Sequence, residues 1–280
     1  MRSNAAAARP APCARRSILN VVVVTPTYNE RENIAQLLPR LLAHGPNYSV
    51  IVVDDGSPDG TGEYVEEYGR RDPRVSVLRR SGKNGLGKAY VAGFHAALQR
   101  PVDYIVQMDA DFSHDPDFVP RLVHAAEVTE SHLVLGSRYI AGAAIKNWPI
   151  KRNLLSRFGN LYARLVLGTR ISDYTTGFTA FRADTLRQLP YLEFDASGFA
   201  FQLEFKHAFQ ARGFRIAELP ITFVERETGV SKMHGGIVFE ALRMVWGVRR
   251  RGKALGVRHE AVVRPKLAVD ATAGERLDDQ

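Results

Sequence analysis

The fold is indicated first by residues 20–30, which read NVVVVTPTYNE. The run of β-branched residues predicts a strand over 20–25, and its continuous apolar character is typical of a strand covered on both faces. Pro26 then begins a polar segment that ends the strand. Similar apolar runs predict strands over 49–53, 75–78, 103–108 and 132–136. Amphipathic stretches predict helices between them, over 30–43, 61–71, 87–99 and 116–128. This alternation predicts a Rossmann-like, mostly parallel sheet flanked by helices.

The second half of the chain has a different character. Residues 150–168 place apolar side chains at helical spacing with lysine and arginine between them, which predicts a basic amphipathic helix. The remaining predicted elements are a loop at 173–177, a strand at 178–182, helices at 184–189 and 199–212, a strand at 219–224 and a helix at 235–250. We expect one domain over 18–251, between a disordered basic tail at 1–17 and a disordered tail at 252–280.

Composition excludes several functional classes. The chain has 280 residues and a single cysteine, Cys13, which excludes a disulfide scaffold and a cysteine-based zinc site. No run of about 18 apolar residues is present, so no transmembrane helix is expected. The net charge of +8 suggests a nucleic-acid-binding protein, but most of this charge lies in the two tails. Residues 1–17 carry four bases and no acid, and residues 249–280 carry eight bases and five acids. The domain between the tails is close to neutral, and we expect no nucleic-acid partner.

Polar segments follow three of the predicted strands, where ligands collect in an open α/β sheet. They are Pro26–Glu30, Asp54–Gly60 and Asp109–Asp111. Clustered carboxylates repel one another unless a cation or a hydrogen-bond donor is near. Asp109 and Asp111 alternate along an extended segment, so one can face a ribose while the other points at a divalent ion. Oxygen ligands suit Mg²⁺ or Mn²⁺, and the pattern therefore predicts a nucleotide diphosphate with a metal. The alternative is that Asp111 only caps the loop before Pro116.

A glycine-rich segment, Gly82–Lys88, has the glycine and lysine spacing of a P-loop. Ala89 stands where the P-loop hydroxyl should meet Mg²⁺, and the segment follows the third strand instead of the first. The sequence therefore argues against an ATPase or GTPase. A loop that admits a substrate phosphate or sugar is favoured, and a plain turn is the other option.

Taken in order, these motifs resemble those of the dolichol-phosphate (polyprenol-phosphate) mannosyltransferases, inverting enzymes of glycosyltransferase family 2 with a GT-A fold. The resemblance runs from about Val21 to Arg250. Its motifs lie at residues 26–33, 54–61, 85–90, 108–114, 136–139 and 226–232. The ordered set is more specific than any one motif, and it implies a GT-A type α/β fold with amphipathic helices in the C-terminal half.

The resemblance also implies roles for matching residues on the donor side. The residues expected around the guanosine of GDP-mannose are Pro26, Tyr28, Glu30, Val53 and Asp55. Asp109, Ala110 and Asp111 are expected to contact the sugar nucleotide. Asp109 and Asp111 are the expected ligands of Mg²⁺ or Mn²⁺, with Asp111 the main one.

Three basic residues are implied to bind phosphates of the donor or the acceptor: Arg138, Arg226 and Lys232. Arg226 and Lys232 lie in a glycine-containing loop that is expected to close over the bound donor; the alternative is that they are exposed loop charges. Asp111, Arg226 and Lys232 are the residues expected to act in catalysis.

The implied reaction is attack by a polyprenyl monophosphate oxygen on the anomeric carbon of mannose, with GDP leaving and the configuration inverting. A phosphate monoester has a second pKa of about 6, so the nucleophile is already an anion and needs no strong base. A rival enzyme of the same family would use a UDP-sugar. Another rival would transfer sugar to a hydroxyl and would need a carboxylate base, for which Glu204 and Asp173 are the candidates.

A lipid acceptor implies contact with a membrane. Residues 131–172 carry seven bases and no acid, and the helix expected at 235–250 ends in arginine. Basic amphipathic helices of this kind are expected to bind an anionic membrane surface. Packing on the core, or docking on a separate membrane subunit, are the alternatives. We expect a cytoplasmic protein that is peripheral on the inner face of the plasma membrane.

Overall fold

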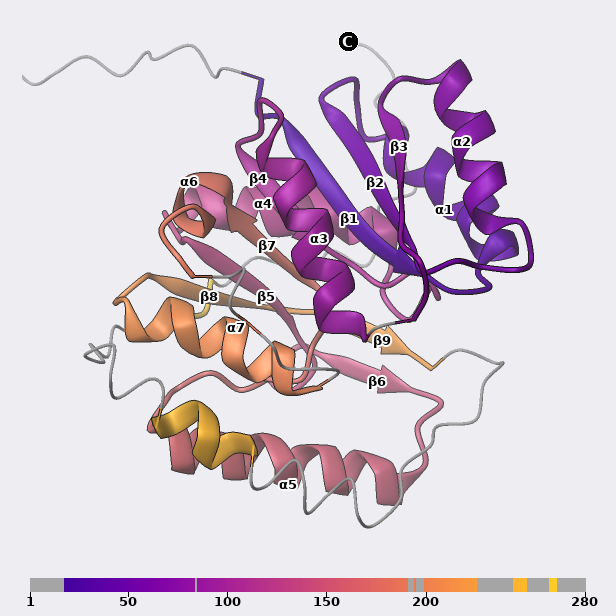
Figure 1. Ribbon diagram of the computed structural model, residues 1–280. Helices are drawn as coiled ribbons and strands as arrows, with labels where there is room; N and C mark the ends of the chain where they lie inside the picture. Colours follow the sequence, from indigo (N-terminus) through magenta and orange to yellow (C-terminus); the bar gives the residue numbers. More distant parts are fainter. Residues whose placement is uncertain are drawn as a thin grey trace, which may run out of the picture.

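The computed structural model describes residues 18–83, 85–190, 194, 199–225, 244–250 and 262–265. Their centre is an eight-stranded sheet with the strand order β10-β8-β5-β7-β4-β1-β2-β3 (Figure 1). The strands are β1 (Val21–Thr27), β2 (Tyr48–Asp54), β3 (Val75–Arg79), β4 (Tyr104–Gln107), β5 (Leu133–Ser137), β7 (Thr179–Arg182), β8 (Ile216–Pro220) and β10 (Val262–Val263). Strand β7 runs antiparallel to β4 and β5, while the other pairings of this sheet are parallel. The sheet is therefore mostly parallel, as the sequence predicts.

Helices cover both faces of the sheet because its strands are apolar on both sides. In β1, Val21 and Val23 join one core cluster, and Val22 and Val24 join the other. The first cluster includes side chains of α1 (Arg31–Leu42), α2 (Thr61–Arg71) and α4 (Val119–Val128), which follows the short 3₁₀ turn η1 (Pro116–Phe118). The second includes side chains of α3 (Leu86–Leu98), α6 (Ala183–Leu186) and α7 (Phe199–Ala211). Each face is thereby closed by a separate layer of helices.

A further helix, α5 (Ile150–Leu167), lies beyond α7 on the side away from the main sheet (Figure 1). A two-stranded parallel sheet of β6 (Ala144–Lys146) and β9 (Thr222–Val224) lies between the main sheet and α5 in Figure 1. Residues 244–250 form a helical turn beside α5, where the indole Nε1 of Trp246 donates to the Tyr162 hydroxyl at 2.9 Å. Among the described residues, no helix combines the length and the apolar character that crossing a bilayer requires.

Most elements of the first half match the predictions to within one or two residues, but three regions of the second half differ. The strand predicted at 219–224 is two strands, because β8 ends at Pro220, which has no N–H to donate, and β9 pairs with β6 instead. Strand β6 was not predicted. The tail predicted as disordered at 252–280 contains β10, an edge strand that pairs with β8. Residues 1–17 and 235–243 of the predicted tail and helix lie outside the described residues.

A glycine in α3 tests how closely this helix packs on the sheet, and a glycine in α5 serves as the comparison. A Cβ on Gly93 of α3 would lie 2.3 Å from Cγ1 of Val24 and 2.9 Å from Cγ2 of Val53. We predict that Gly93→Ala lowers the free energy of unfolding by about 1–3 kcal/mol, because the added methyl overpacks the interface. At Gly159 of α5 a Cβ meets nothing within 4 Å, so Gly159→Ala should stabilise by up to about 1 kcal/mol. Denaturant unfolding measures both, and an unchanged Gly93→Ala variant would contradict the close packing.

Candidate active site

The loops that follow β1 and β2 are joined by hydrogen bonds at the carboxyl edge of the sheet. The backbone N–H of Asn29 donates to the Ser57 hydroxyl at 3.0 Å, and that of Glu30 donates to the Thr61 hydroxyl at 3.2 Å. A third backbone N–H, from Arg31, reaches Asp59 Oδ2 at 3.1 Å. Two segments that are distant in sequence therefore form one polar surface. This surface carries the residues predicted to hold the nucleoside.

The predicted nucleoside residues lie together on this surface. Pro26 is the register partner of Val53 at the ends of the two strands. Tyr28 is exposed, and the ammonium of Lys83, from the glycine-rich segment, lies 4.7 Å from the centre of its ring. Glu30 is half-buried. A cationic side chain over an exposed ring leaves a flat apolar surface beside positive charge, which suits an aromatic base attached to phosphate.

Asp55, the fifth predicted residue, is buried at the start of the loop that follows β2. Its carboxylate forms an ion pair with Arg80 at 2.7 Å. Burial raises the pKa of Asp55, and the Arg80 guanidinium opposes that rise. The neighbouring Asp54 accepts hydrogen bonds from the Thr27 and Ser57 hydroxyls. The two adjacent carboxylates thus have different partners, and the hydrogen bonds of Asp54 stabilise the loop that follows β2.

Asp109 and Asp111 stand directly after β4, on either side of buried Ala110. The Tyr90 hydroxyl donates to Asp109 Oδ1 at 2.5 Å. Burial and the charge of Asp109 hold the pKa of Tyr90 well above its usual value, so the hydroxyl keeps the proton that it donates. The backbone N–H of Ser113 donates to Asp111 Oδ1 at 3.1 Å. Both carboxylates are therefore oriented before any ligand binds.

The pair fits a divalent cation that shares its coordination with a substrate. Both carboxylates are half-buried, and each offers hard oxygen ligands. Among the described residues, no group of three or more His, Cys, Asp or Glu side chains is arranged to hold a metal ion. A site with two carboxylates matches the way Mg²⁺ is held by one or two side chains together with waters and phosphates. It does not match a closed structural metal site.

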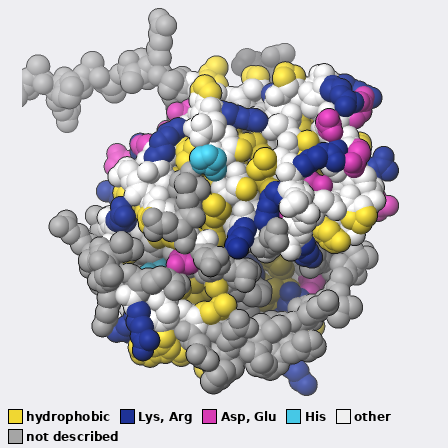
Figure 2. Space-filling model, in the orientation of Figure 1, with side chains coloured by type: hydrophobic (Ala, Val, Ile, Leu, Met, Phe, Trp, Pro, Cys, Tyr) yellow, Lys and Arg dark blue, Asp and Glu magenta, His cyan; other side chains and the backbone are white. Residues whose placement is uncertain are grey.

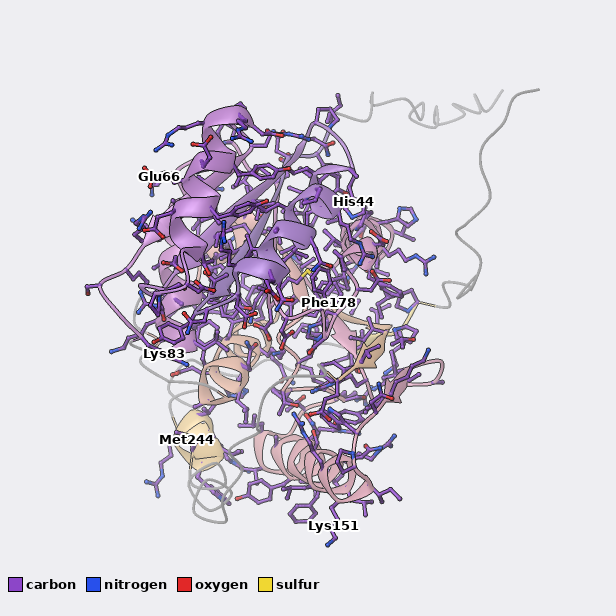
Figure 3. All side chains as sticks on the ribbon, turned by 90° about the vertical axis from the view of Figure 1, so that its right-hand side faces the viewer. His44, Glu66, Lys83, Lys151, Phe178 and Met244 are labelled. Carbon is purple, nitrogen blue, oxygen red and sulfur yellow. The ribbon has the colours of Figure 1, made fainter. Side chains whose placement is uncertain are left out.

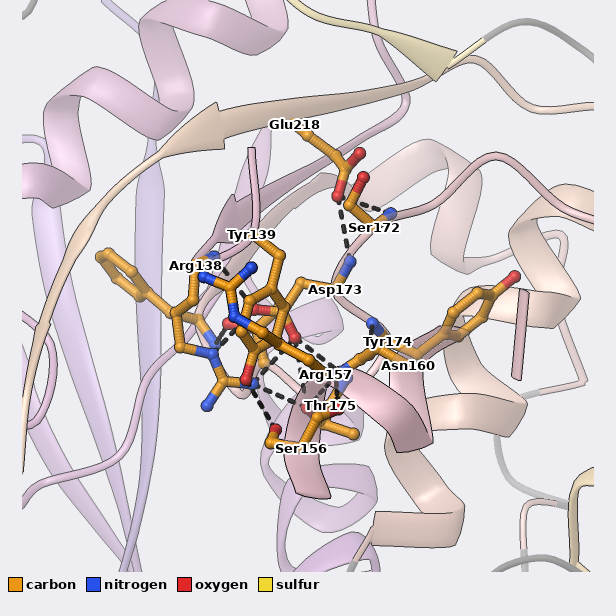
Figure 4. Close-up of polar contacts among 12 residues, drawn as sticks. Arg138, Tyr139, Ser156, Arg157, Asn160, Ser172, Asp173, Tyr174, Thr175 and Glu218 are labelled. Atoms are coloured by element: carbon orange, nitrogen blue, oxygen red, sulfur yellow. Dashed lines mark hydrogen bonds and ion pairs between the residues drawn. The ribbon is translucent and has the colours of Figure 1, made fainter. Parts of the chain in front are cut away.

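Arg138 follows β5, and its side chain forms a buried ion pair with Asp173 (Figure 4). Its Nε donates to Asp173 Oδ2 at 2.7 Å, and its Nη2 donates to Asp173 Oδ1 at 2.8 Å and to the Thr175 hydroxyl at 2.7 Å. Burial acts to raise the pKa of Asp173, but the attraction and hydrogen bonds of Arg138 outweigh it and lower the pKa. Asp173, a candidate base in the hydroxyl-acceptor alternative, is therefore held ionised by an arginine and is a weak proton acceptor.

The loop that carries Asp173 is clamped to α7 by a buried lysine. The ammonium of Lys206, fully buried on α7, donates to the Thr176 carbonyl at 2.7 Å and to Gln202 Oε1 at 2.9 Å. Burial lowers the pKa of Lys206 to about 7. The next residue in the loop, Gly177, lies so close to Asp109 that a Cβ would come within 3.1 Å of its Oδ2. The loop therefore contacts both Arg138 and the carboxylate pair, the latter through Asp109.

His114 is buried below the same site and is held neutral. Its ring lies 5.0 Å from the ring of Phe178 and 5.2 Å from that of Phe223, measured between centroids. Burial, assisted by the charge of Arg138, lowers the pKa of His114 to about 4. With a pKa this low, the neutral imidazole is a weak proton acceptor near neutral pH.

The structure thus brings together most of the predicted site residues and adds several that the sequence did not reveal. Arg226 and Lys232 lie outside the described residues. Glu204, the other base candidate of the hydroxyl-acceptor alternative, is half-buried on α7. The sequence did not predict the contacts of Tyr90, Thr175, Gly177 and Lys206, although Tyr90 lies in the motif at 85–90 and Thr175 and Gly177 lie in the predicted loop. Each of these residues contacts a partner that is far away in sequence.

One side of α5 carries an exposed apolar stripe. The side chains of Ile150, Leu154, Phe158, Leu161 and Leu165 are all at least half exposed. Their spacing of three or four residues places them along one side of the helix. In Figure 2, hydrophobic and basic side chains lie next to each other at the lower left, where α5 and residues 244–250 lie in Figure 1. Figure 3 shows the same two segments, marked by Lys151 and Met244, at one end of the molecule.

The sheet order, the helices on both faces and the carboxylate pair after β4 define a GT-A type glycosyltransferase. A model of the family described as "Glycosyl transferase family 2" matches residues 22–189, and the chain belongs to this family. The resemblance predicted from the sequence motifs is confirmed.

Relatives and a solved structure agree with this assignment. The chain is 46% identical over 242 residues to an undecaprenyl-phosphate mannosyltransferase of Micrococcus luteus, with 86% of this chain and 99% of that protein covered. It is 43% identical over 250 residues to a polyprenol monophosphomannose synthase of Mycolicibacterium smegmatis, with 88% and 94% covered. Its fold is similar to that of glucosyl-3-phosphoglycerate synthase from Mycobacterium tuberculosis, with a TM-score of 0.60, 20% identity, and 86% and 81% of the two chains covered.

The hydrogen bond from Tyr90 to Asp109 generates a prediction about metal binding. Partners that orient a metal ligand contribute about 10- to 100-fold in metal affinity or activity. We predict that Tyr90→Phe raises the Mg²⁺ or Mn²⁺ concentration for half-maximal activity about tenfold. Tyr104→Phe is the matched control, because its hydroxyl also meets a carboxylate, that of Glu127, but away from the site. Equal metal requirements in the two variants would contradict the orienting role.

Proposed function

We propose that this protein is an inverting transferase that moves mannose from GDP-mannose to a polyprenyl monophosphate, giving polyprenyl-phosphate-mannose and GDP. Family membership supports the reaction class. The names of the two relatives at 46% and 43% identity support mannose and a polyprenyl phosphate as the transferred sugar and the acceptor. The observation that carries the proposal is the oriented pair Asp109 and Asp111, set beside the joined loops after β1 and β2.

The donor is proposed to lie across the ends of β1, β2 and β4. Its guanosine occupies the surface formed by Pro26, Tyr28, Glu30, Val53 and Asp55. Its diphosphate lies at Asp109, Ala110 and Asp111. These two carboxylates would hold Mg²⁺ or Mn²⁺, which neutralises the charge of the diphosphate when bound. Without that neutralisation, acidic side chains would repel an anionic donor.

The acceptor phosphate is proposed to lie on the far side of the carboxylate pair from the nucleoside. Sheet order supports this, since β5 lies beyond β7 from β4, whereas β1 and β2 lie on the other side. Arg138 follows β5, and its Nη1 makes no hydrogen bond with another described residue (Figure 4). We place this Nη1 at the acceptor phosphate. Arg226 and Lys232 are proposed to bind phosphates as well.

The chemistry follows from the charge of the acceptor. An oxygen of the phosphate monoester forms a bond to the anomeric carbon while the bond from that carbon to the GDP oxygen breaks. The nucleophile is already ionised near neutral pH, because its second pKa is about 6, so no side chain has to remove a proton. Positioning and neutralisation of two phosphate groups are then the main tasks of the protein. Asp173, whose pKa is lowered by Arg138, and His114, whose pKa is lowered to about 4 by burial, are both weak proton acceptors, which is consistent with a site that lacks a general base.

Access to a lipid acceptor is proposed to come from the membrane surface, on the inner face of the plasma membrane. The exposed stripe on α5 is flanked by Lys151 on one side and by Arg157 and Arg164 on the other, at 100° per residue. Trp246 is also exposed beside it. Apolar side chains bordered by cations match the interface of an anionic leaflet. A separate membrane subunit on the same stripe is the alternative outcome.

A transfer assay tests the reaction. Labelled GDP-mannose, Mg²⁺ and a polyprenyl phosphate are expected to give label in the organic phase, and labelled UDP-glucose is expected to give none. We predict that Asp111→Ala lowers kcat/KM by about 10³-fold, because the diphosphate charge is no longer neutralised. Asp115→Ala is the control, since that exposed carboxylate pairs with Arg40. Transfer from UDP-glucose alone would refute the donor assignment, and a fully active Asp111→Ala enzyme would refute the metal role of Asp111.

Vesicle flotation tests the membrane surface. Binding to anionic vesicles is expected at low salt and should weaken at high salt, as charges are screened. We predict that Phe158→Glu weakens this binding about tenfold, because it places a carboxylate in the apolar stripe. Val128→Glu is the control, since Val128 on α4 is as exposed as Phe158, at 59% against 58%. Absence of vesicle binding at low salt would exclude direct association.

A further inference from the structure

A fully buried carboxylate on β8 is the starting point. Glu218 is 0% exposed and lies opposite Leu135 of β5 in the strand register. Its Oε1 accepts the backbone N–H of Ser172 at 2.9 Å and that of Asp173 at 3.1 Å. A carboxylate inside a protein is costly unless it meets donors and an opposite charge. Here the donors are the backbone of the loop that binds Arg138.

The opposite charge comes from the C-terminal part of the chain. Arg264 follows β10, whose pairing with β8 sets Val262 against Ile216 and Val263 against Ala217. Its Nη2 lies 3.3 Å from Glu218 Oε2. The same Nη2 donates to the Ser172 hydroxyl at 2.9 Å and to the Arg170 carbonyl at 3.2 Å. One guanidinium therefore ties β8 to the loop at 170–173.

The loop at 170–173 connects Arg264 and Glu218 to Arg138 in the site. The Asp173 backbone is fixed by Glu218, and its carboxylate accepts both the backbone N–H and the side chain of Arg138. Figure 4 shows Glu218, the loop and Arg138 as one connected set of polar contacts. Burial raises the pKa of Glu218, and the attraction of Arg264 opposes that rise. Loss of Arg264 would favour the protonated carboxyl, which accepts the two backbone N–H groups less strongly.

We propose that Arg264 is a positioning residue, which keeps Glu218 bound to the Ser172 and Asp173 backbone and so fixes the Arg138 guanidinium for the acceptor phosphate. The proposal rests on the proposed function for its last step only. It assigns a role in the site to a segment that follows the predicted end of the catalytic domain at 251. Arg264 touches no substrate in this scheme and acts through three intervening residues.

Hydrogen exchange and transfer kinetics on the full chain test the proposal with Arg264→Ala and Arg264→Lys. Arg215→Ala is the matched control, because Arg215 precedes β8, has a similar exposure of 43% against 49%, and pairs with Glu130 instead. Exchange of the Ser172 and Asp173 amides should rise about tenfold in Arg264→Ala. The kcat/KM for polyprenyl phosphate should fall about tenfold while the KM for GDP-mannose stays within about twofold. Arg264→Lys should recover part of both effects, and the control should show neither.

Each contrary result overturns a defined step. Unchanged exchange at Ser172 and Asp173 in Arg264→Ala would refute the link through Glu218, whatever the enzyme does. Faster exchange that extends equally to β1 amides would mean general destabilisation and would refute a local role. Faster exchange at Ser172 and Asp173 with an unchanged kcat/KM for polyprenyl phosphate would refute the positioning of Arg138 by Arg264. If the wild-type chain transfers no mannose at all, the proposed function fails, and the exchange experiment still decides the link from Arg264 to the loop.

Discussion

Carboxylates gathered at one edge of a parallel sheet set the main physical constraint on this protein. Asp54, Asp55, Asp109 and Asp111 follow two strands that are separated only by β1. Each is compensated differently: Asp54 by hydroxyls, Asp55 by Arg80, Asp109 by a tyrosine that keeps its proton, and Asp111 by a backbone N–H. We propose that a divalent cation with a diphosphate compensates the pair after β4.

Around Arg138 the requirement is the opposite one: a buried arginine has to be neutralised and held in one orientation. Arg138 is buried, and the Asp173 carboxylate neutralises it. The position of Asp173 depends in turn on Glu218, which accepts its backbone N–H, and on Lys206, which donates to the Thr176 carbonyl of the same loop. A paired arginine attracts a phosphate less strongly than a free one, but its remaining donor is fixed in direction. For a reaction that depends on in-line placement of two phosphates, fixed direction is the more valuable property.

Sequence patterns predicted where the polar segments after the strands lie, but not the contacts around Arg138, for a physical reason. The strands and their polar ends are local features, so residues 26–30, 54–60 and 109–111 could be placed from alternation and turn chemistry alone. Arg138 was found only through the family resemblance, and its partner Asp173 was considered as a base. Arg264 was assigned to a disordered tail, because a two-residue edge strand has no periodicity. Tyr90 and Lys206 act on groups that only the folded chain brings near.

The central claim is that the carboxylate edge binds a sugar nucleotide through a divalent cation. Isothermal titration calorimetry of GDP-mannose, with and without Mn²⁺ and in the absence of any lipid, tests it most directly. We expect binding that is at least about tenfold tighter with the metal and that loses this dependence in Asp111→Ala. Equal affinity for GDP-mannose in the presence of a chelator would contradict it.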